Sequence, residues 1–442
     1  MHTAPRSLKH APMTFAVMCL LAACGRGPTP TGTPLHGLGA ATLPGTYKYV
    51  HTLAKVPSST TAAQLATQYA GLVLSYDALA GTATIANDSS TRGKYDTAVE
   101  QNTKAFRVAE QGTAGWASGY SAWSTGYSAW STGYSAWSTG STTGATTFSE
   151  NVPLWDVINL SSAQTLVPEL GQGVKVAVID SGIDLNHAAF LGKLDTTNAK
   201  DYVDGDTLPQ EVNGDTTGGF SNGYGHGTAV ADIVLQVAPN VTILPIRVLN
   251  PDGVGDTASI AAAITHAVNS GAKVINLSLG TSQNSAAMNQ AITDAISKGV
   301  RVVTAAGNTG DTNVLYPAVP ADGTNTQGSG SVGVGAVTKG NTKAKFSVYG
   351  NNLELSAPGE SITTAFPAGG TVSATGTSFS TPVVSGVIAL ALSTGVTETS
   401  STALTQLMSN LDATAKPVND SQYGTQMGYG TIDAYAFIHK YR

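Results

Sequence analysis

The pattern of apolar residues changes at about residue 150. Beyond that point, near-continuous apolar runs alternate with spans of helical periodicity, and such runs are typical of strands buried on both faces of a sheet. We expect strands at 174–180, 241–249, 273–279, 301–307 and 331–337, and helices at 257–271, 284–299, 378–393 and 402–411. Strand–helix–strand units of this length predict parallel strands with right-handed crossovers. Residues 151–442 are therefore expected to form a three-layer α/β domain with a mostly parallel central sheet.

Shorter elements precede this domain, over residues 46–111. Their order is predicted to be strand, helix, hairpin, helix and strand, at 46–56, 58–71, 72–86, 93–101 and 105–110. Together they predict a small α+β domain in front of the larger one.

The chain begins with the features of an exported protein. Arg6 and Lys9 precede the apolar stretch 11–23, which is too short to span a bilayer and indicates a signal peptide over residues 1–23. Cys19 would be lost with this signal, so the mature chain would contain no disulfide. Only 11% of the residues are charged, which also suits a secreted protein.

The signal ends in Leu21-Ala22-Ala23-Cys24, which resembles the lipobox of bacterial lipoproteins and implies that Cys24 carries a lipid anchor. The alternative is a plain signal peptide cleaved after Ala23. Residues 24–45 are rich in Pro, Gly and Thr and predict an extended tether.

Residues 112–150 contain a repeat of seven residues, because GYSAWST occurs three times between 119 and 139. The period is too short for a solenoid and lacks the charges of a coiled coil. We interpret the segment as a linker whose indoles pack on a neighbouring domain, with an aromatic carbohydrate-binding or cell-wall-binding strip as the alternative.

The net charge of −6 is unevenly distributed. Residues 1–149 carry 9 basic and 5 acidic residues, a net +4, whereas residues 150–442 carry 13 and 23, a net −10. The split predicts two parts that attract each other and argues against a nucleic acid as partner of the acidic part.

Three glycine-flanked segments carry the candidate chemistry: VAVIDSGID (176–184), GHGTAV (225–230) and GTSFSTP (376–382). Asp180 ends an expected strand, where open α/β sheets place their active residues. His226 and Ser378 each open a helix-like span, and the N–H groups at such a start can stabilise an oxyanion. The order Asp, His, Ser predicts nucleophilic acyl transfer.

Residues 151–442 resemble the subtilisin-like serine proteases, which implies a serine endopeptidase that hydrolyses peptide bonds through an acyl-enzyme. The resemblance makes Asp180, His226 and Ser378 the triad and, through AAGNTG (305–310), makes Asn308 the second oxyanion donor. NLSLG (276–280) and PDGVGD (251–256) are similar to the two strands that clamp the substrate, and they contribute Gly253, Gly255, Ser278, Leu279 and Gly280. YPA (316–318) matches a family turn and implies a cis Tyr316–Pro317 bond.

Two rival functions stay open. The chain could be a catalytically silent surface protein that binds through its fold and the Trp repeat, which the filled catalytic positions disfavour. It could also be a transpeptidase or maturase that uses the same triad. The segments Ser278–Gly280 and Thr304–Gly307 border a small, uncharged pocket, which favours apolar or aromatic residues before the cut.

This sequence also departs from the family pattern. Ala229 stands where a second His is usual and Ser380 where Ala is usual, and neither change removes a catalytic group. The stretch 231–239 is shorter than in well-known secreted members, which puts the calcium site of that loop in doubt. A weaker metal candidate is the acidic loop 201–215, with Asp201, Asp204, Asp206 and Asp215, for which a solvated surface loop is the alternative.

The domain at 46–111 resembles the inhibitory propeptide that precedes many secreted proteases, although an unrelated α+β module stays open. We therefore expect a monomeric zymogen that needs no cofactor for its chemistry and leaves a structural calcium ion open. Its partners would be protein or peptide substrates and its own propeptide, with no nucleic acid and no membrane contact beyond the lipid. The precursor would be anchored to a bacterial membrane, and cleavage would release the catalytic domain.

Overall fold

The computed structural model describes residues 43–108, 148–217, 220–319, 331–395 and 401–442. The predicted signal peptide, Cys24, most of the tether and the GYSAWST repeat lie outside these residues. No helix in the described ranges combines the length and apolarity needed to cross a bilayer.

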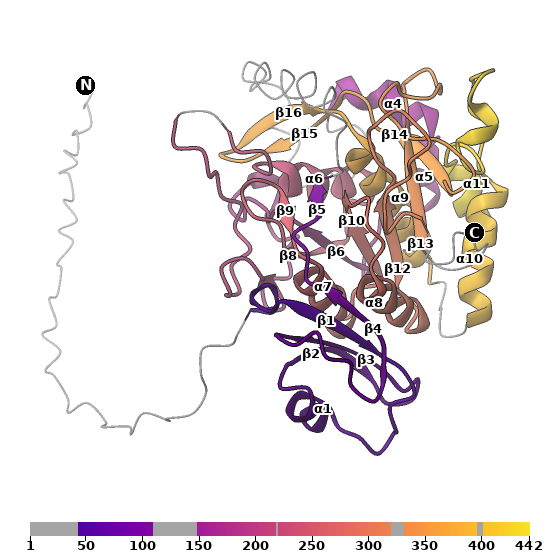
Figure 1. Ribbon diagram of the computed structural model, residues 1–442. Coiled ribbons are helices and arrows are strands. Elements are labelled where there is room, and N and C mark those ends of the chain that lie inside the picture. The colour runs from indigo at the N-terminus through magenta and orange to yellow at the C-terminus, as the bar shows by residue number, and fades with distance from the viewer. Residues whose placement is uncertain (1–42, 109–147, 218–219, 320–330, 396–400) are drawn as a thin grey trace, which may run out of the picture. The chain divides into compact units, whose positions relative to one another are not determined.

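A seven-stranded parallel sheet forms the centre of the larger domain, in the order β14-β13-β12-β10-β6-β8-β7 (Figure 1). Its members are β6 (Lys175–Asp180), β7 (Lys200–Asp201), β8 (Thr242–Arg247), β10 (Val274–Leu277), β12 (Arg301–Ala305), β13 (Ser331–Val337) and β14 (Leu355–Pro358). All five predicted strands are confirmed. Runs such as Val176 to Ile179 are almost wholly buried, as expected for a sheet covered on both faces.

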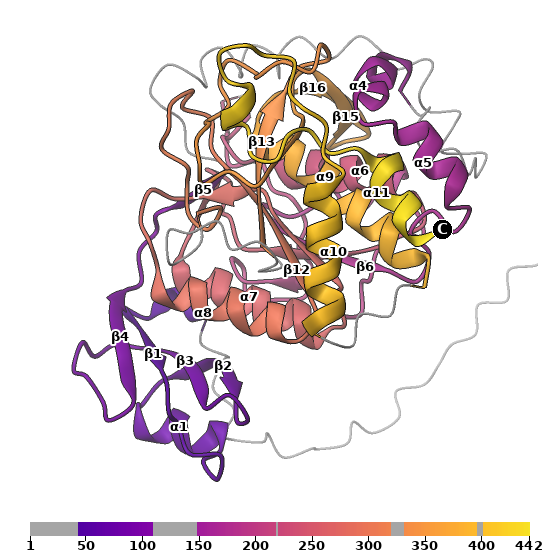
Figure 2. The ribbon, with the colours of Figure 1, turned by 90° about the vertical axis from the view of Figure 1, so that its right-hand side faces the viewer.

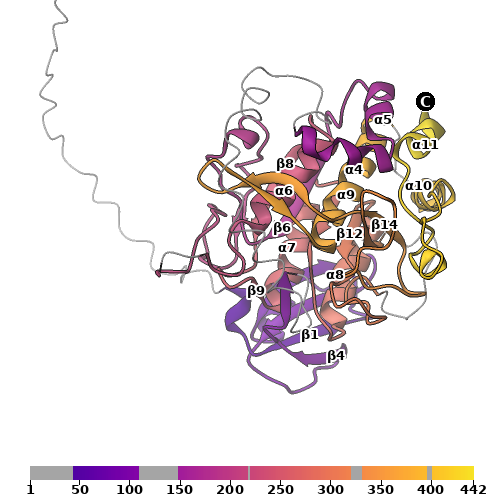
Figure 3. The ribbon, with the colours of Figure 1, turned by 90° about the horizontal axis from the view of Figure 1, so that it is seen from above.

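Helices cover both faces of the sheet and make the domain three-layered. One core joins the sheet to α5 (Leu160–Leu166), α6 (His226–Val237), α9 (Thr377–Ser393), α10 (Ser401–Ala413) and α11 (Ala434–Ile438). A second core lies on the other face, under α7 (Thr257–Asn269) and α8 (Ala286–Ser297), as Figure 3 shows from above. The larger domain also contains α4 (Val152–Val157) and the hairpin of β15 (Ile362–Phe366) and β16 (Gly370–Ala374).

The smaller domain is a four-stranded antiparallel sheet in the order β2-β3-β1-β4, with one helix on its outer face. Its elements are β1 (Tyr49–Leu53), α1 (Ala62–Gln68), β2 (Leu72–Asp77), β3 (Thr82–Asn87) and β4 (Asp96–Gln101). The opposite face of this sheet packs on α7 and α8, which lie between the two sheets (Figure 2). Val50 and Leu74 thereby join the core of the larger domain.

The predicted helix at 93–101 is wrong, because β4 occupies this segment. Residues Asp96–Gln101 pair with β1 along the sheet edge and stay largely unburied, so no apolar alternation marks them as a strand. Hydrogen bonding to β1, a long-range contact, outweighs the local helix propensity of this segment.

The last predicted strand of this region, at 105–110, leaves the smaller domain. Its described part is β5 (Phe106–Val108), which pairs with β9 (Val254–Gly255) and β11 (Leu279–Gly280) of the larger domain.

Candidate active site

Asp180 and His226 are in direct contact at the carboxyl end of the sheet. Asp180 is the last residue of β6 and His226 the first of α6, and His226 Nδ1 lies 2.7 Å from Asp180 Oδ1. Their exposed fractions are 1% and 2%. A carboxylate at Nδ1 keeps the proton on that nitrogen, which leaves Nε2 of the neutral ring as an acceptor.

Two glycines allow this approach. Gly225 has φ 87°, and a Cβ there would lie 2.2 Å from the ring of Phe366. A Cβ on Gly227 would lie 2.0 Å from the carbonyl oxygen of Gly182, in the loop after Asp180. A larger residue at position 227 would therefore push the first turn of α6 away from the loop after β6, and one at position 225 would strain the backbone and displace Phe366 of β15.

Ser378 lies in the first turn of α9, where backbone N–H groups have no partner within the helix. Its Oγ donates to the carbonyl oxygen of Ser278 at 3.1 Å, and Ser278 Oγ donates back to the carbonyl of Ser378 at 2.7 Å. The two hydrogen bonds fix α9 against the segment that follows β10.

Asn308 follows β12 and is oriented by the residue before Ser378. Its Oδ1 accepts hydrogen bonds from N and Oγ1 of Thr377, at 2.8 and 3.0 Å. The side-chain amide Nδ2 is thereby turned toward Gly376, where a Cβ would lie 3.3 Å away. The structure thus brings the side chain of Asn308 to the start of α9, next to the turn that carries Ser378.

Four of the five predicted substrate-binding residues contact β5. Phe106 pairs with Gly255 and Val108 with Leu279, while Arg107 pairs with Gly280. The N–H of Val108 also donates to the Gly253 carbonyl at 3.2 Å, and Ser278, the fifth residue, precedes Leu279 in the sequence. An extended segment of this chain therefore lies between the two segments that the family resemblance assigns to the substrate, and it is paired with them as in strand addition.

Glu211 belongs to the site although no motif singled it out. It is 5% exposed and accepts hydrogen bonds from Ser181, Gly227 and Thr228, the residues that follow Asp180 and His226. Burial, with a smaller contribution from the charge of Asp180, raises the pKa of Glu211 to about 7. In the sequence, Glu211 is one more acid in the loop 201–215, and only the folded path of that loop brings it to α6.

The predicted metal residues of this loop do not converge. The carboxylates of Asp201 and Asp204 both bind the guanidinium of Arg247, at 2.9 and 2.6 Å. Asp206 accepts from Leu208 N, and Asp215 accepts from Thr217. In the described part of the chain, no three His, Cys, Asp or Glu side chains form a group that could hold a metal ion.

The two departures from the family pattern are accommodated. Ala229 is fully buried in α6, and its carbonyl accepts from Thr364 Oγ1 at 2.8 Å. Ser380 is fully buried beside Gly359, where a Cβ on the glycine would lie 2.1 Å from its Oγ. The bond between Tyr316 and Pro317 is cis, as predicted.

Known proteins share this architecture. The Subtilase family model matches residues 171–430. The chain is 34% identical to Thermitase of Thermoactinomyces vulgaris, over 61% of this chain and 89% of that protein. It is 35% identical to Subtilisin DY of Bacillus licheniformis, over 60% of this chain and 91% of that protein. A solved protease structure from Pseudoalteromonas arctica superposes with TM-score 0.55 and 26% identity, covering 66% of this chain and 97% of the other.

Proposed function

The chain belongs to the subtilase family and is a serine endopeptidase, and from this premise we propose that Asp180, His226 and Ser378 are its catalytic triad. The observation that carries the proposal is that His226 contacts both other segments: its Nδ1 lies 2.7 Å from Asp180 Oδ1, and its ring centroid lies 5.4 Å from that of Phe379, the residue after Ser378. The Asp180–His226 contact, the helix N-terminus at Ser378 and the donor at Asn308 supply the groups that acyl transfer needs.

The proposed reaction begins with a rotation of Ser378 Oγ, whose proton points at the Ser278 carbonyl, toward Nε2 of His226. His226 takes the proton as Oγ attacks the scissile carbonyl carbon, and Asp180 stabilises the imidazolium. The amide of Asn308 and the N–H of Ser378 bind the resulting oxyanion. His226 then gives the proton to the leaving amine, and water releases the acyl group by the same steps.

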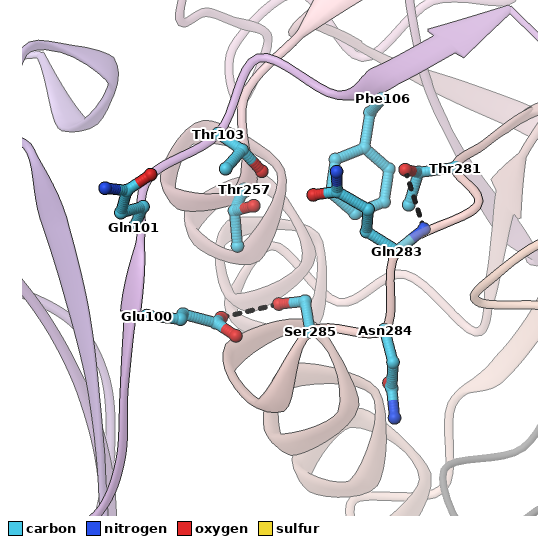
Figure 4. Close-up of a pocket in the computed structure, with 9 residues that line it drawn as sticks. All are labelled: Glu100, Gln101, Thr103, Phe106, Thr257, Thr281, Gln283, Asn284 and Ser285. Atoms are coloured by element: carbon cyan, nitrogen blue, oxygen red, sulfur yellow. Dashed lines mark hydrogen bonds between the residues drawn. The ribbon is translucent and has the colours of Figure 1, made fainter.

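We further propose that residues 46–111 are an inhibitory propeptide. Its strand β5 fills the cleft, and β4 and the following residues cap two helices of the larger domain. Glu100 accepts from Ser285 Oγ at 2.6 Å (Figure 4). It also accepts from the N–H groups of Ala286 and Ala287 at the start of α8. Asn102 Oδ1 accepts from Ala258 N at the start of α7, at 2.9 Å. These contacts satisfy helix N-termini that would otherwise face water.

In the proposed precursor, residues 1–23 are the signal, 24–45 the tether from a lipidated Cys24, 112–150 a linker and 151–442 the catalytic domain. The substrates are proteins or peptides, and no cofactor takes part in the chemistry. The protease is exported as a membrane-anchored zymogen, acts as a monomer and is released by its own cut.

The cut should follow Val108 closely. Val108 pairs with Leu279, the neighbour of Ser278, and Ser278 is hydrogen-bonded to Ser378. If the chain continues along the cleft from β5, the peptide bond next to Ser378 is within a few residues of Val108. It is not at the C-terminal end of the GYSAWST repeat.

Expression of the full chain and of Ser378→Ala tests the proposal. We expect the wild type to be processed, to react with a fluorophosphonate probe at Ser378 and to start shortly after Val108 on N-terminal sequencing. Ser378→Ala should stay full-length and unlabelled. A processed Ser378→Ala protein, or wild type without a Ser378 adduct, would contradict the assignment.

A further inference from the structure

We propose that Glu211 is a positioning residue of the active site, whose single carboxylate holds the segments that carry Asp180 and His226 in register. The inference rests on the proposed catalytic roles of those two residues. It concerns a loop residue that no motif of the sequence marks.

The contacts of Glu211 join the two segments directly. Oε1 accepts from Ser181 Oγ at 2.5 Å and from Gly227 N at 3.3 Å. Oε2 accepts from Thr228 N at 3.2 Å and from Thr228 Oγ1. Ser181 follows Asp180, and Gly227 and Thr228 follow His226, so one side chain bridges the residues next to both members of the pair.

The hydroxyl groups around Glu211 are themselves oriented. Ser181 Oγ accepts from Gly227 N at 3.0 Å, which directs its own proton to Glu211. Thr228 Oγ1 accepts from Asp184 N at 2.9 Å and likewise donates to Glu211. Every one of these partners donates to the carboxylate, so the network as built requires its ionised form.

Burying a carboxylate costs desolvation free energy, which an apolar side chain of similar size would avoid, so packing alone does not explain Glu211. Here the carboxylate lies at the N-terminus of α6, where the helix dipole and two backbone N–H groups favour negative charge. The neighbouring charged groups are Asp180 at the end of β6, Asp184 in the next loop, His226 on α6 and Arg247 on β8. Arg247 is engaged by Asp201 and Asp204, so hydrogen bonds and the dipole stabilise Glu211.

Ionisation of Glu211 should therefore be needed for full activity, in addition to the neutral form of His226. Because burial raises the pKa of Glu211 to about 7, its ionisation falls within the pH range that an activity profile covers. The acid limb of log kcat/KM against pH should then be steeper than one ionisation allows, with a slope that approaches about 2.

The test compares wild type, Glu211→Gln, Glu211→Asp and Asp232→Asn as full chains that mature themselves, with active sites counted by fluorophosphonate titration. Glu211→Gln should lower kcat about 10- to 100-fold, change KM little and reduce the slope of the acid limb to about 1. Glu211→Asp, which keeps the charge, should lower kcat but keep the steep limb. Asp232 is a matched control, since it is a buried carboxylate on the same helix that binds Gln236, Thr364 and Ala365 instead.

Asp232→Asn should lose thermal stability and keep the steep limb. The inference is overturned by a wild-type limb with a single ionisation, by Glu211→Gln with wild-type kcat and slope, or by the same shallow limb in Asp232→Asn. If Glu211→Gln does not mature, a shallow limb in Glu211→Asp overturns it. Failure of the triad assignment looks different, since wild type would then form no Ser378 adduct.

Discussion

At the scale of single residues, the side chain of Asn308 should contribute to kcat and hardly to KM. Thr377 donates two hydrogen bonds to its Oδ1, which fixes the orientation of the amide and leaves Nδ2 as the donor for a developing oxyanion. Asn308→Ala should lower kcat by about 10²–10³-fold with little change in KM, because this donor acts mainly in the transition state. Steady-state kinetics on a peptide amide would measure the effect. Asn313→Ala in the same loop is the control, and equal losses in both variants would show that loop distortion is responsible.

Sequence motifs identified some of the candidate site residues and missed others. Asp180, His226 and Ser378 could be singled out because each lies in a short segment that contains glycine, whereas Asn308 could be named only through the family resemblance of AAGNTG. Glu211 could not, because its partners are two backbone amides and two hydroxyls from segments distant in the chain. Its acidic neighbours were only a weak metal candidate in the sequence, and the ion pairs to Arg247 show how two of them are used.

At the scale of elements, the N-terminus of α8 is where the smaller domain is held. Glu100→Ala removes three hydrogen bonds to a carboxylate there. Each hydrogen bond to a charged group is worth about 1.5–3 kcal/mol, and because water replaces some of these part-buried contacts we expect a net loss equal to about one such bond. After processing, the cut domain should leave about 10- to 100-fold faster, seen as a shorter lag before activity appears. Asp88→Ala, which alters an exposed contact with Lys48 instead, should keep the wild-type lag. An unchanged lag in Glu100→Ala would mean that β5 alone controls release.

A buried pair of acids joins α10 to the segment before β14. Burial, and then the charge of Asp412, raises the pKa of Glu354 to about 8, and burial raises that of Asp412 to about 7. The folded chain thus holds these protons more tightly than the unfolded chain. The stability that they contribute is complete below the ordinary carboxyl pKa and is lost as the pH rises through about 7 to 8.

Glu354→Gln should therefore raise the melting temperature at pH 9 and not at pH 4, by about 2–4 °C for each kcal/mol of repulsion removed. Thermal unfolding in the Ser378→Ala background avoids autolysis. Glu169→Gln is the control, because Arg442 lowers the pKa of that exposed carboxylate and its loss should bring no gain at pH 9. If Glu354→Gln melts at a lower temperature than the parent protein at pH 9, repulsion between Glu354 and Asp412 does not destabilise the fold.

Element prediction succeeded where packing and periodicity agree. The five strands of the parallel sheet are buried on both faces, so apolar runs marked them. The segment Asp96–Gln101 is an edge strand with polar residues on both sides, and its partner β1 is distant in sequence. No local signal could have replaced that long-range pairing.

At the scale of the whole molecule, the proposed anchor and the proposed cut lie on the same side of the catalytic domain in the sequence. A C-terminal epitope should therefore leave the membrane fraction in wild type and stay there in Ser378→Ala, as fractionation and blotting would show. Cys24→Ser in the Ser378→Ala background should release the full-length chain. Equal retention of wild type and Ser378→Ala would exclude release by self-cleavage.

The pairing of β5 with β9 and β11 has a kinetic consequence for the intact chain. While the peptide link persists, the blocking strand is present at a fixed, high effective concentration that dilution cannot change. Once the link is broken, blocking becomes a bimolecular equilibrium that depends on how many molecules share the volume. Protease crowded on a surface would then stay silent, and the same protease spread into a large volume would become active, so dilution itself becomes the trigger.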